Sequence, residues 1–518
     1  GASIFASNIG SEHLIGLAGA GASSGMAMAH WEIQGWMILI LGWVFVLFYT
    51  RSMVYTMPEF LERRYNPQSR TILSVISLVS YVLTKVAVTV YAGGLVFQQV
   101  FGIKELWGID FFWIAAIGLV VLTALYTIFG GMKSVLYTSV LQTPILLLGS
   151  LIILVLGFKE LGGWDEMMRV CGAVTVNDYG DTMTNLIRSN DDANFPWLGA
   201  LIGSAIIGFW YWCTDQFIVQ RVLSGKNEME ARRGTIFGAY LKLLPVFLFL
   251  IPGMIAFALH QKYIGAGGEG FLPMLANGTA NADAAFPTLV AKLLPAGVKG
   301  LVVCGILAAL MSSLASLFNS SAMLFTIDFY KRFRPETPEK KLVGIGQVAT
   351  VVIVILGILW IPIMRSVGDV LYTYLQDVQS VLAPGIAAAF LLGICWKRTS
   401  AQGGMWGLIA GMVIGLTRLG AKVYYSNAGE VADSTFKYLF YDMNWLFFCG
   451  WMFLFCIIVV IVVSLATKAP TAEKIQGLVF GTATKEQKAA TRASWNHWDI
   501  IHTVIILAIT AAFYWYFW

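Results

Sequence analysis

The chain has 518 residues, of which 58% are hydrophobic and only 12% are charged, with a formal net charge of +5. Soluble domains carry about 25% charged residues, so the composition excludes a water-soluble protein. The basic residues lie in short loops between apolar runs, which speaks against a nucleic-acid-binding surface. The mean hydropathy of +0.73 indicates a protein embedded in the lipid bilayer.

Apolar runs recur along the whole chain, and about thirteen are long enough to cross a bilayer as a helix of roughly 20 residues. The predicted spans are 1–25, 31–50, 71–101, 108–129, 138–158, 197–222, 233–259, 298–328, 341–363, 368–395, 403–424, 445–467 and 498–517. Lys and Arg are concentrated in the loops on one side, which the positive-inside rule makes cytoplasmic. The long loops near 159–196 and 260–297 then lie outside. We therefore predict an all-α multi-pass protein of the cell (plasma or inner) membrane.

Two of the predicted spans are interrupted by Gly and polar residues. The first contains "FASNIGSEHLIGLAGAGASSG", and the second, within 197–222, contains "GSAIIGFWYWCTDQ". Broken helices at corresponding positions of two halves indicate a transporter built from inverted repeats. Such backbone is tolerated in a bilayer only where it faces protein or a wet cavity. This pattern predicts a first repeat of five helices at 1–158, a second at 197–395, and three peripheral helices at 396–518 with a cytoplasmic loop at 468–497.

Ionisable residues inside spans are costly and indicate function. Glu32 and Lys242 lie in helices otherwise suited to burial, and either bind a polar solute or form an ion pair that joins two helices. Both readings stay open at this stage. Asp215 and Arg221, near the cytoplasmic end of a span, are predicted to form a structural ion pair.

Polar and aromatic side chains in two spans suit a solute with several hydroxyl groups. Gln376 lies mid-span, and each amide or phenol can exchange hydrogen bonds with a hydroxyl. Tyr211 and Trp212 adjoin the second interruption, where flat rings can stack on a sugar. Helix-to-helix hydrogen bonding and core packing are the alternatives.

A run of hydroxyls in "LAALMSSLASLFNSSAMLFTIDFY" indicates a cation site. Ser312 and Ser313 begin a face of serines spaced three or four residues apart. Neutral hydroxyls together with carbonyls freed by a broken helix suffice to bind sodium, and carbonyls near Ala6 and Ile9 would supply the remainder. Close packing of small residues is the alternative.

Several long motifs resemble the sodium/glucose cotransporters of the solute:sodium symporter family. They are "FASNIG", "GLAGAGASSG", "TMPEFLERRY", "WYWCTDQFIVQR", "AYLKLLPVF", "LAALMSSLASLFNSS", "LFTIDFYK" and "FLLGICWKR", within residues 1 to about 425. The resemblance implies a LeuT-type fold with alternating access around a mid-membrane site. Families of this type carry a further helix before the first broken one, and the chain does not begin with Met, so we expect a trimmed start.

The resemblance also implies roles for individual residues. Sugar ligands fall on Asn8, His13, Glu32, Tyr211, Trp212, Lys242 and Gln376. Gate positions fall on Leu17, Trp31, Tyr211 and Tyr372, with Tyr211 at the inner gate. Sodium ligands fall on the carbonyls of Ala6, Ile9 and Ala309 and the hydroxyls of Ser312 and Ser313.

Three positions depart from the family pattern. Gly208 stands where a polar Thr or Asn contacts the sugar, which predicts a missing hydrogen bond or one replaced by water. Ser139 stands where many members have an Asp linked to a second sodium, so one sodium per sugar is expected. Glu12 has no assigned role.

The expected function is sodium-driven uptake of a hexose, glucose or galactose. A sodium-coupled inositol or polyol symporter is the alternative within the family, and a sugar sensor or sodium channel without coupled transport is the alternative outside it. An enzyme with a haem or di-metal centre would need several inward histidines. Only His13 and His30 lie close together in the helical region, so no enzymatic activity is expected. The sequence leaves the oligomeric state open.

Overall fold

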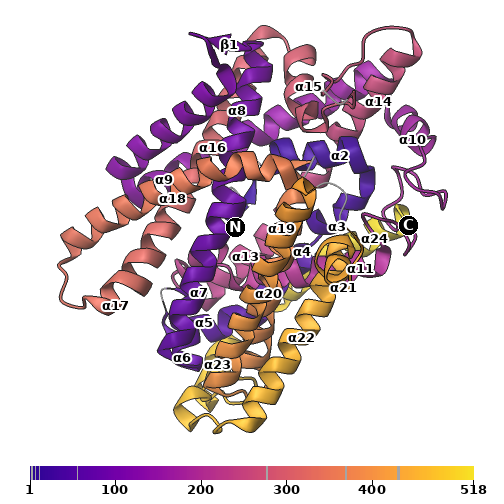
Figure 1. Ribbon diagram of the computed structural model, residues 1–518. Helices are drawn as coiled ribbons and strands as arrows, with labels where there is room; N and C mark the ends of the chain where they lie inside the picture. The colour runs from indigo at the N-terminus through magenta and orange to yellow at the C-terminus, as the bar shows by residue number, and fades with distance from the viewer. Residues whose placement is uncertain are drawn as a thin grey trace.

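The protein is almost entirely helical (Figure 1). The computed structural model describes residues 1, 4–5, 8–10, 12–54, 56–275, 278–367, 370–428 and 432–518, without the side chains of 126, 128–143 and 364–367. Among the described residues, the strands are β1 (Glu105–Leu106) and β2 (Ile109–Asp110), an antiparallel hairpin. Its tight turn places Trp107 and Gly108 at positive φ.

The helices fall into three consecutive groups. The first group contains α2 (Ala18–Ser24), α3 (Ala29–Glu32), α4 (Gly35–Ile40), α5 (Val46–Ser52), α6 (Met57–Arg64), α7 (Pro67–Ser80), α8 (Ala87–Phe101), α9 (Phe111–Leu161) and α10 (Trp164–Gly172). The second contains α11 (Trp197–Gly208), α12 (Gln216–Leu223), α13 (Glu228–Lys242), α14 (Ile251–Gly265), α15 (Ala285–Leu293), α16 (Ala296–Met323), α17 (Lys331–Phe333), α18 (Glu339–Val367) and α19 (Leu371–Cys395). The third contains α20 (Ala401–Asn427), α21 (Thr435–Lys437), α22 (Trp445–Ala466), α23 (Lys485–Ala493) and α24 (His497–Tyr516).

Short stretches of wider or tighter helix join these elements. The π-helical stretches are Glu12–Leu17, Leu41–Phe45, Tyr81–Val86, Phe209–Thr214, Val246–Leu250, Leu324–Tyr330 and Tyr438–Asp442. The 3-10 turns are Gly25–Met28, Ala282–Ala284 and Ala472–Lys474. Because π-helical stretches occur frequently at functional sites, the first and fourth of them are of special interest.

Within the described residues, eleven helical segments are long and apolar enough to span a bilayer, which is close to the count of thirteen expected from the sequence. They are Glu12–Ser52, Pro67–Phe101, Pro144–Leu161, Trp197–Thr214, Glu228–Gly265, Ala296–Phe333, Glu339–Ile363, Leu371–Cys395, Ala401–Asn427, Trp445–Ala466 and His497–Tyr516. The difference has two sources. The spans expected at 1–25 and 31–50 belong to one segment, and the span expected at 108–129 corresponds to the shorter apolar stretch Phe111–Leu125.

The spans expected at 108–129 and 138–158 are parts of one continuous helix, α9, which contains Pro144 in its interior. Glycines weaken a helix by only about 1 kcal/mol each, so the two glycines in "GGMK" do not end this one. The helix ends at Leu161, where Gly162 takes a positive φ.

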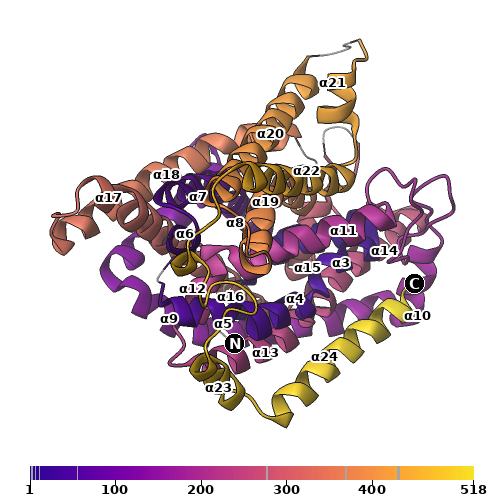
Figure 2. The same cartoon turned by 90° about the horizontal axis from the view of Figure 1, so that it is seen from below.

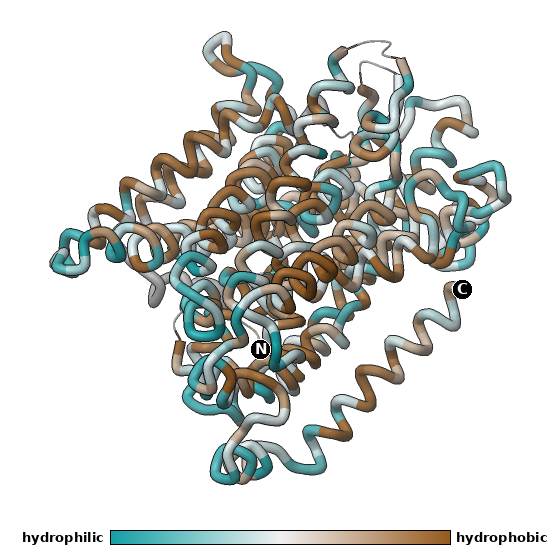
Figure 3. Tube along the Cα trace, turned by 60° about the horizontal axis from the view of Figure 1, so that its bottom comes forward, coloured by the Kyte–Doolittle hydropathy of each residue, from teal (hydrophilic) through white to brown (hydrophobic). Residues whose placement is uncertain are grey.

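The two ends of the molecule differ in the loops that they carry. In Figure 1, α6, α17 and α23 lie toward the lower end, and α10, α15 and the hairpin lie toward the upper end. The basic loops therefore lie opposite the two long loops, as the sequence predicts. Apolar residues predominate along the helices between these ends (Figure 3).

Helix α19 holds the centre of the fold. It packs against α20 and α22 on one side, and against the π-helical stretches Glu12–Leu17 and Phe209–Thr214 on the other. Its contact with α20 is close because two glycines meet there: a Cβ built on Gly411 would lie 2.6 Å from the Cα of Gly385. The two interrupted segments are thus held against one rigid helix.

Helix α24 runs along the outside of the molecule (Figure 2). At its start, the Asp499 carboxylate pairs with Arg233 of α13 at 3.1 Å. At its other end, Tyr514 lies 2.9 Å from His30 of α3. The backbone of Phe517, just beyond α24, accepts a hydrogen bond from the Leu186 amide. The helix therefore ties α13 and α3 together along their length.

The Gly385–Gly411 crossing predicts a stability effect. Replacing Gly411 by Val should force α20 away from α19 and lower stability by about 1–3 kcal/mol, because overpacking displaces backbone. Thermal unfolding of purified protein in detergent, followed by tryptophan fluorescence, measures the change. Gly420→Val in the same helix is the matched control, since a Cβ there meets nothing within 4 Å. Equal melting temperatures for the two variants would contradict the packing argument.

Candidate functional site

A cavity lies where the two interrupted segments meet α3, α13 and α19. Its lining residues are Asn8, Glu12, His13, Trp31, Glu32, Gln34, Ile207, Gly208, Tyr211, Trp212, Lys242, Tyr372, Leu375, Gln376 and Gln379. The structure thus brings all seven predicted sugar ligands to one cavity, although they come from five separate parts of the chain.

The first interrupted segment departs from regular helix just before the cavity. The His13 amide donates to the carbonyl of Gly10, three residues back, rather than to Ile9, four residues back. The Ile9 carbonyl therefore lacks its usual helical donor. A π-helical stretch, Glu12–Leu17, follows directly. Ala6 lies outside the described residues.

The second interruption occurs at Asp215, immediately after the π-helical stretch that carries Tyr211 and Trp212. Asp215 has an extended backbone, with ψ of 127°, and its side chain caps α12 by accepting from the Phe217 amide. The widened turn before the break turns Tyr211 and Trp212 toward the cavity. Both interruptions predicted from glycine and polar residues are therefore real breaks in regular helix.

The Glu32 carboxylate is the central polar group of the cavity. Its Oε2 accepts from Lys242 Nζ at 2.6 Å and lies 3.1 Å from His13 Nε2, while its Oε1 accepts from the Tyr372 hydroxyl at 2.5 Å. Glu32 is fully buried and Lys242 is 4% exposed. A buried charge is tolerated only when it is paired and hydrogen-bonded, and here both conditions hold. Glu32 and Lys242 therefore join two helices and line the cavity at the same time.

Three buried polar atoms of the cavity wall have no hydrogen-bond partner among the described residues. They are His13 Nδ1, Trp31 Nε1 and Gln376 Oε1. Leaving a buried donor or acceptor unpaired costs about 1–3 kcal/mol, so native proteins rarely do so away from functional sites. Two potential donors and one acceptor on residues that line one cavity match the needs of a solute with several hydroxyls.

The predicted cation ligands on α16 are buried beside the first interruption. Ala309, Ser312 and Ser313 are at most 6% exposed. A Cβ built on Gly10 would lie 2.5 Å from Ser313 Oγ, so this bend packs directly on α16. Ser313 Oγ has no hydrogen-bond partner among the described residues. The Ser313 hydroxyl and the Ile9 carbonyl, which lacks its usual helical donor, are the kind of hard oxygen ligands that sodium takes.

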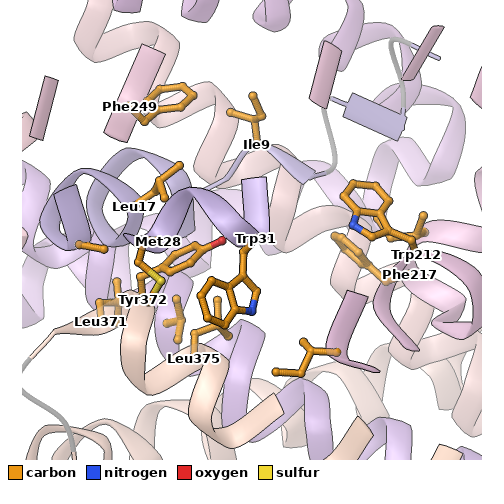
Figure 4. Packing of buried hydrophobic residues seen from close by; sticks show 14 of the residues in the cluster. Ile9, Leu17, Met28, Trp31, Trp212, Phe217, Phe249, Leu371, Tyr372 and Leu375 are labelled. Atoms are coloured by element: carbon orange, nitrogen blue, oxygen red, sulfur yellow. The ribbon is translucent and has the colours of Figure 1, made fainter. Parts of the chain in front are cut away.

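Three of the predicted gate residues, Leu17, Trp31 and Tyr372, belong to the buried hydrophobic cluster (Figure 4). Trp31 stacks on Trp445 of α22, with ring centroids 5.4 Å apart. Tyr372 is held by Glu32, and Leu17 is fully buried but does not line the cavity. Tyr211 is partly exposed, and the Lys85 ammonium lies 4.6 Å from its ring centroid.

The predicted ion pair between Asp215 and Arg221 is wrong. Asp215 instead pairs with Lys85 at 3.1 Å and accepts from the Tyr81 hydroxyl at 2.8 Å. Arg221 donates to the Phe217 carbonyl and to Ser316 Oγ. The reason is the break at Asp215, which turns its side chain away from the helix face that carries Arg221.

Sequence reasoning missed Gln34, which lines the cavity from the turn between α3 and α4. Its amide occupies the space beside Gly208, where the missing side chain was expected to leave a hydrogen bond unfilled or filled by water. Nothing in the local pattern marks this glutamine, because it lies at a short turn rather than on a helix face. Ser139, the other departure, lies among residues whose side chains are not described.

On the outer side of the molecule, the Asp283 side chain binds the first residue of α19. Its two carboxylate oxygens both lie 3.2 Å from the Leu371 amide, which donates to them, and its Oδ1 packs against Gly19 of α2. Asp283 is 3% exposed, and burial raises the pKa of its carboxyl group to about 7. The loop containing Asp283 therefore connects α2, which follows the first interruption, to the helix that carries Tyr372 and Gln376.

Comparison with known proteins gives consistent matches. A family model described as the sodium:solute symporter family matches residues 1–411. Sodium/myo-inositol cotransporter 2 of Homo sapiens is 36% identical over 495 residues, covering 93% of this chain and 72% of that protein. Sodium/glucose cotransporter 1 of Ovis aries is 38% identical over 486 residues, covering 90% and 72% respectively.

The fold is also found among solved structures. The structure of a Na⁺-coupled sialic acid symporter in a substrate-bound, outward-open state aligns with a TM-score of 0.68 at 21% identity, covering 91% of this chain and 90% of that one. At this identity the likeness shows the fold alone. The fold is of the LeuT type, as the motifs imply, and the division of this chain into repeats at 1–158 and 197–395 stays a prediction.

The raised pKa of Asp283 predicts a pH-dependent stability. Between the unfolded pKa near 4 and the folded pKa near 7, the folded protein holds a proton that the unfolded chain releases, so stability falls as pH rises. The slope from this group is about 1.4 kcal/mol per pH unit between pH 4 and pH 7, and it vanishes outside that range. Melting temperatures between pH 5 and 8 measure it.

Asp283→Asn should remove this component, because the amide stays neutral while its oxygen still accepts from Leu371. Asp191→Asn, at an exposed position of the other long loop, is the matched control and should keep the slope. An unchanged slope in Asp283→Asn would show that the carboxylate is not buried in solution.

Proposed function

The chain belongs to the sodium:solute symporter family, and from this premise we propose that it takes up a hexose, glucose or galactose, by alternating access. It is a sodium-coupled, multi-pass membrane transporter and not an enzyme. The proposal concerns the identity of the solute and the residues that bind it.

The observation that carries this proposal is the chemistry of the cavity wall. Its unpaired His13, Trp31 and Gln376 atoms offer both donors and acceptors, which a hydroxyl group satisfies in either direction. The aromatic rings of Tyr211 and Trp212 flank the same space and supply a flat apolar surface for a pyranose ring. Asn8, Glu32 and Lys242 complete the proposed set of ligands.

The charges at the site favour an uncharged solute. Glu32 and Lys242 neutralise each other at 2.6 Å, so neither presents an uncompensated charge. A charged solute would compete with this buried pair, and breaking such a pair costs about 3–5 kcal/mol. A hydroxyl can instead add a hydrogen bond to the pair without displacing it.

An inositol is the second candidate solute. Several relatives at 36–37% identity over 93% of the chain are named sodium/myo-inositol cotransporters. Both solutes are neutral six-membered rings with hydroxyls around their edge, which is the chemistry that the cavity suits. They differ at the ring oxygen and the hydroxymethyl group, which inositol lacks.

Sodium would bind at Ile9, Ala309, Ser312 and Ser313, together with Ala6, beside the first interruption. The segment that supplies the Ile9 carbonyl to this site also carries Asn8 and His13 into the solute cavity. Ion binding to this segment therefore orders the solute ligands that the same segment carries. By linkage, solute must tighten sodium binding by the same factor.

We infer one sodium per solute from Ser139, which stands where a second site would need a carboxylate. Each charge that crosses 100 mV releases about 2.3 kcal/mol, so one sodium sustains a roughly forty-fold accumulation of a neutral solute from voltage alone. A second ion would square that factor. Reversal potentials in proteoliposomes measure the ratio.

A panel of radiolabelled hexoses and inositols in proteoliposomes, with and without an imposed sodium gradient, tests the solute assignment. We expect gradient-dependent accumulation of glucose or galactose. Accumulation of inositol alone would establish the second candidate, and binding without accumulation against a gradient would establish a sensor.

Two cavity substitutions test the ligand assignment. Gln376→Ala and Glu32→Ala should each abolish measurable hexose uptake while the protein still reaches the membrane, because one removes a solute ligand and the other leaves Lys242 unpaired. Uptake per inserted protein is the measurement. Gln402→Ala, at an exposed position of α20, is the control and should transport normally. Normal uptake by Gln376→Ala would refute its role as a ligand.

The ion site predicts a separate effect. Ser313→Ala should raise the sodium concentration for half-maximal uptake by about tenfold, since one oxygen ligand is lost. Ser320→Ala, further along the same helix, is the matched control because its hydroxyl bonds to Gln220 and the Ser316 carbonyl. A silent Ser313→Ala would move the ion site elsewhere.

A further inference from the structure

We propose that Gln34 is a specificity-determining ligand of the cavity, whose side-chain oxygen accepts a hydrogen bond from one hydroxyl of the solute. The inference rests on the proposed function, because it concerns the same cavity and the same class of polyhydroxylated solute. It adds a residue that neither the motifs nor the resemblance singles out, together with a reason for the glycine at position 208.

Gln34 is held in one orientation by its surroundings. It lies at the turn between α3 and α4 and is 2% exposed. Its Nε2 donates to the Ser204 carbonyl of α11 at 2.9 Å. A backbone carbonyl only accepts, so this contact identifies the nitrogen end of the amide and leaves Oε1 as the other end. Oε1 has no hydrogen-bond donor among the described residues.

Gly208 is what makes room for this amide. A Cβ built on Gly208 would lie 2.2 Å from Gln34 Oε1 and 3.0 Å from its Cδ, and both residues line the cavity. Any side chain at 208 would therefore displace the glutamine oxygen from its place. The two residues form one unit. Helix α11 has no side chain at position 208, and Gln34 in the turn between α3 and α4 supplies the polar group there instead.

The unit selects for a particular chemistry in the solute. An acceptor with a fixed direction binds a hydroxyl that donates, and it gains nothing from a hydrogen or a methyl group at the same place. Sites built to hydrogen-bond a hydroxyl discriminate strongly against the analogue that lacks it, because the protein group is then left unpaired. Gln34 should therefore distinguish the transported solute from one of its monodeoxy analogues.

A double-mutant cycle tests the unit. The variants are Gln34→Leu, Gly208→Ala and the combination of the two. They are assayed for uptake and for quenching of Trp31 and Trp212 fluorescence by whichever panel solute the unmodified protein accumulates. Gln34→Leu should weaken solute affinity by about tenfold, and Gly208→Ala should do the same by displacing the amide. The double variant should be little worse than either one, since both remove the same contact.

The monodeoxy analogues supply the readout that a purely structural role would not move. In the unmodified protein, one analogue should bind about tenfold more weakly than the parent solute. Gln34→Leu should bind that analogue and the parent solute equally, while its discrimination against the other analogues stays unchanged. Gln34→Ala combined with Gly208→Ser should restore part of the affinity, because a serine hydroxyl then occupies the vacated space. Fluorescence quenching keeps the test informative for a variant that binds but does not transport.

The outcomes separate this inference from the proposed function. Accumulation of a hexose or inositol with unchanged affinity in Gln34→Leu, or additive losses in the cycle, would overturn the role of Gln34 alone. Absence of accumulation or binding of any polyhydroxylated solute by the unmodified protein would overturn both.

Discussion

The buried carboxylate of Glu32 is the constraint on which the rest of the site depends. An isolated charge at this depth would be far too costly, so three other side chains must be brought to it from distant parts of the chain. Lys242, His13 and Tyr372 reach it from α13, from the first interrupted segment and from α19. Satisfying one charge therefore fixes the relative positions of four elements, and the cavity is the space left between them.

The breaks in two helices supply groups that a regular helix does not offer. A regular helix uses its carbonyls internally and offers a ligand only side chains, whereas the bend at Ile9–Gly10, which packs against Ser313, leaves the Ile9 carbonyl without its usual helical donor. At Asp215 the break turns a carboxylate toward Lys85 and leaves Tyr211 under that cation. One interruption lies beside the proposed ion site, and the other positions the aromatic face of the cavity.

Much of this arrangement could be predicted from the sequence, because membrane burial makes polar residues conspicuous. Glu32, Lys242 and Gln376 stand out in apolar spans, and the glycines mark both breaks. The ion-pair partner of Asp215 was harder to predict, since Arg221 is near Asp215 in sequence whereas Lys85 is near it only in space. Gln34 could not be found at all, because its importance depends on the absence of a side chain on another helix. The continuity of α9 was missed because two glycines weaken a helix without ending it.

The position of α24, which contacts α13 at one end and α3 at the other, bears on how the molecule is made. This helix holds α13 through Asp499 and α3 through Tyr514, and these two helices carry Lys242 and Glu32. It is also synthesised after every residue of the cavity. A nascent chain therefore contains every residue of the cavity before α24 is made, so a chain that stalls late in translation carries all these residues and lacks the helix that contacts both α3 and α13.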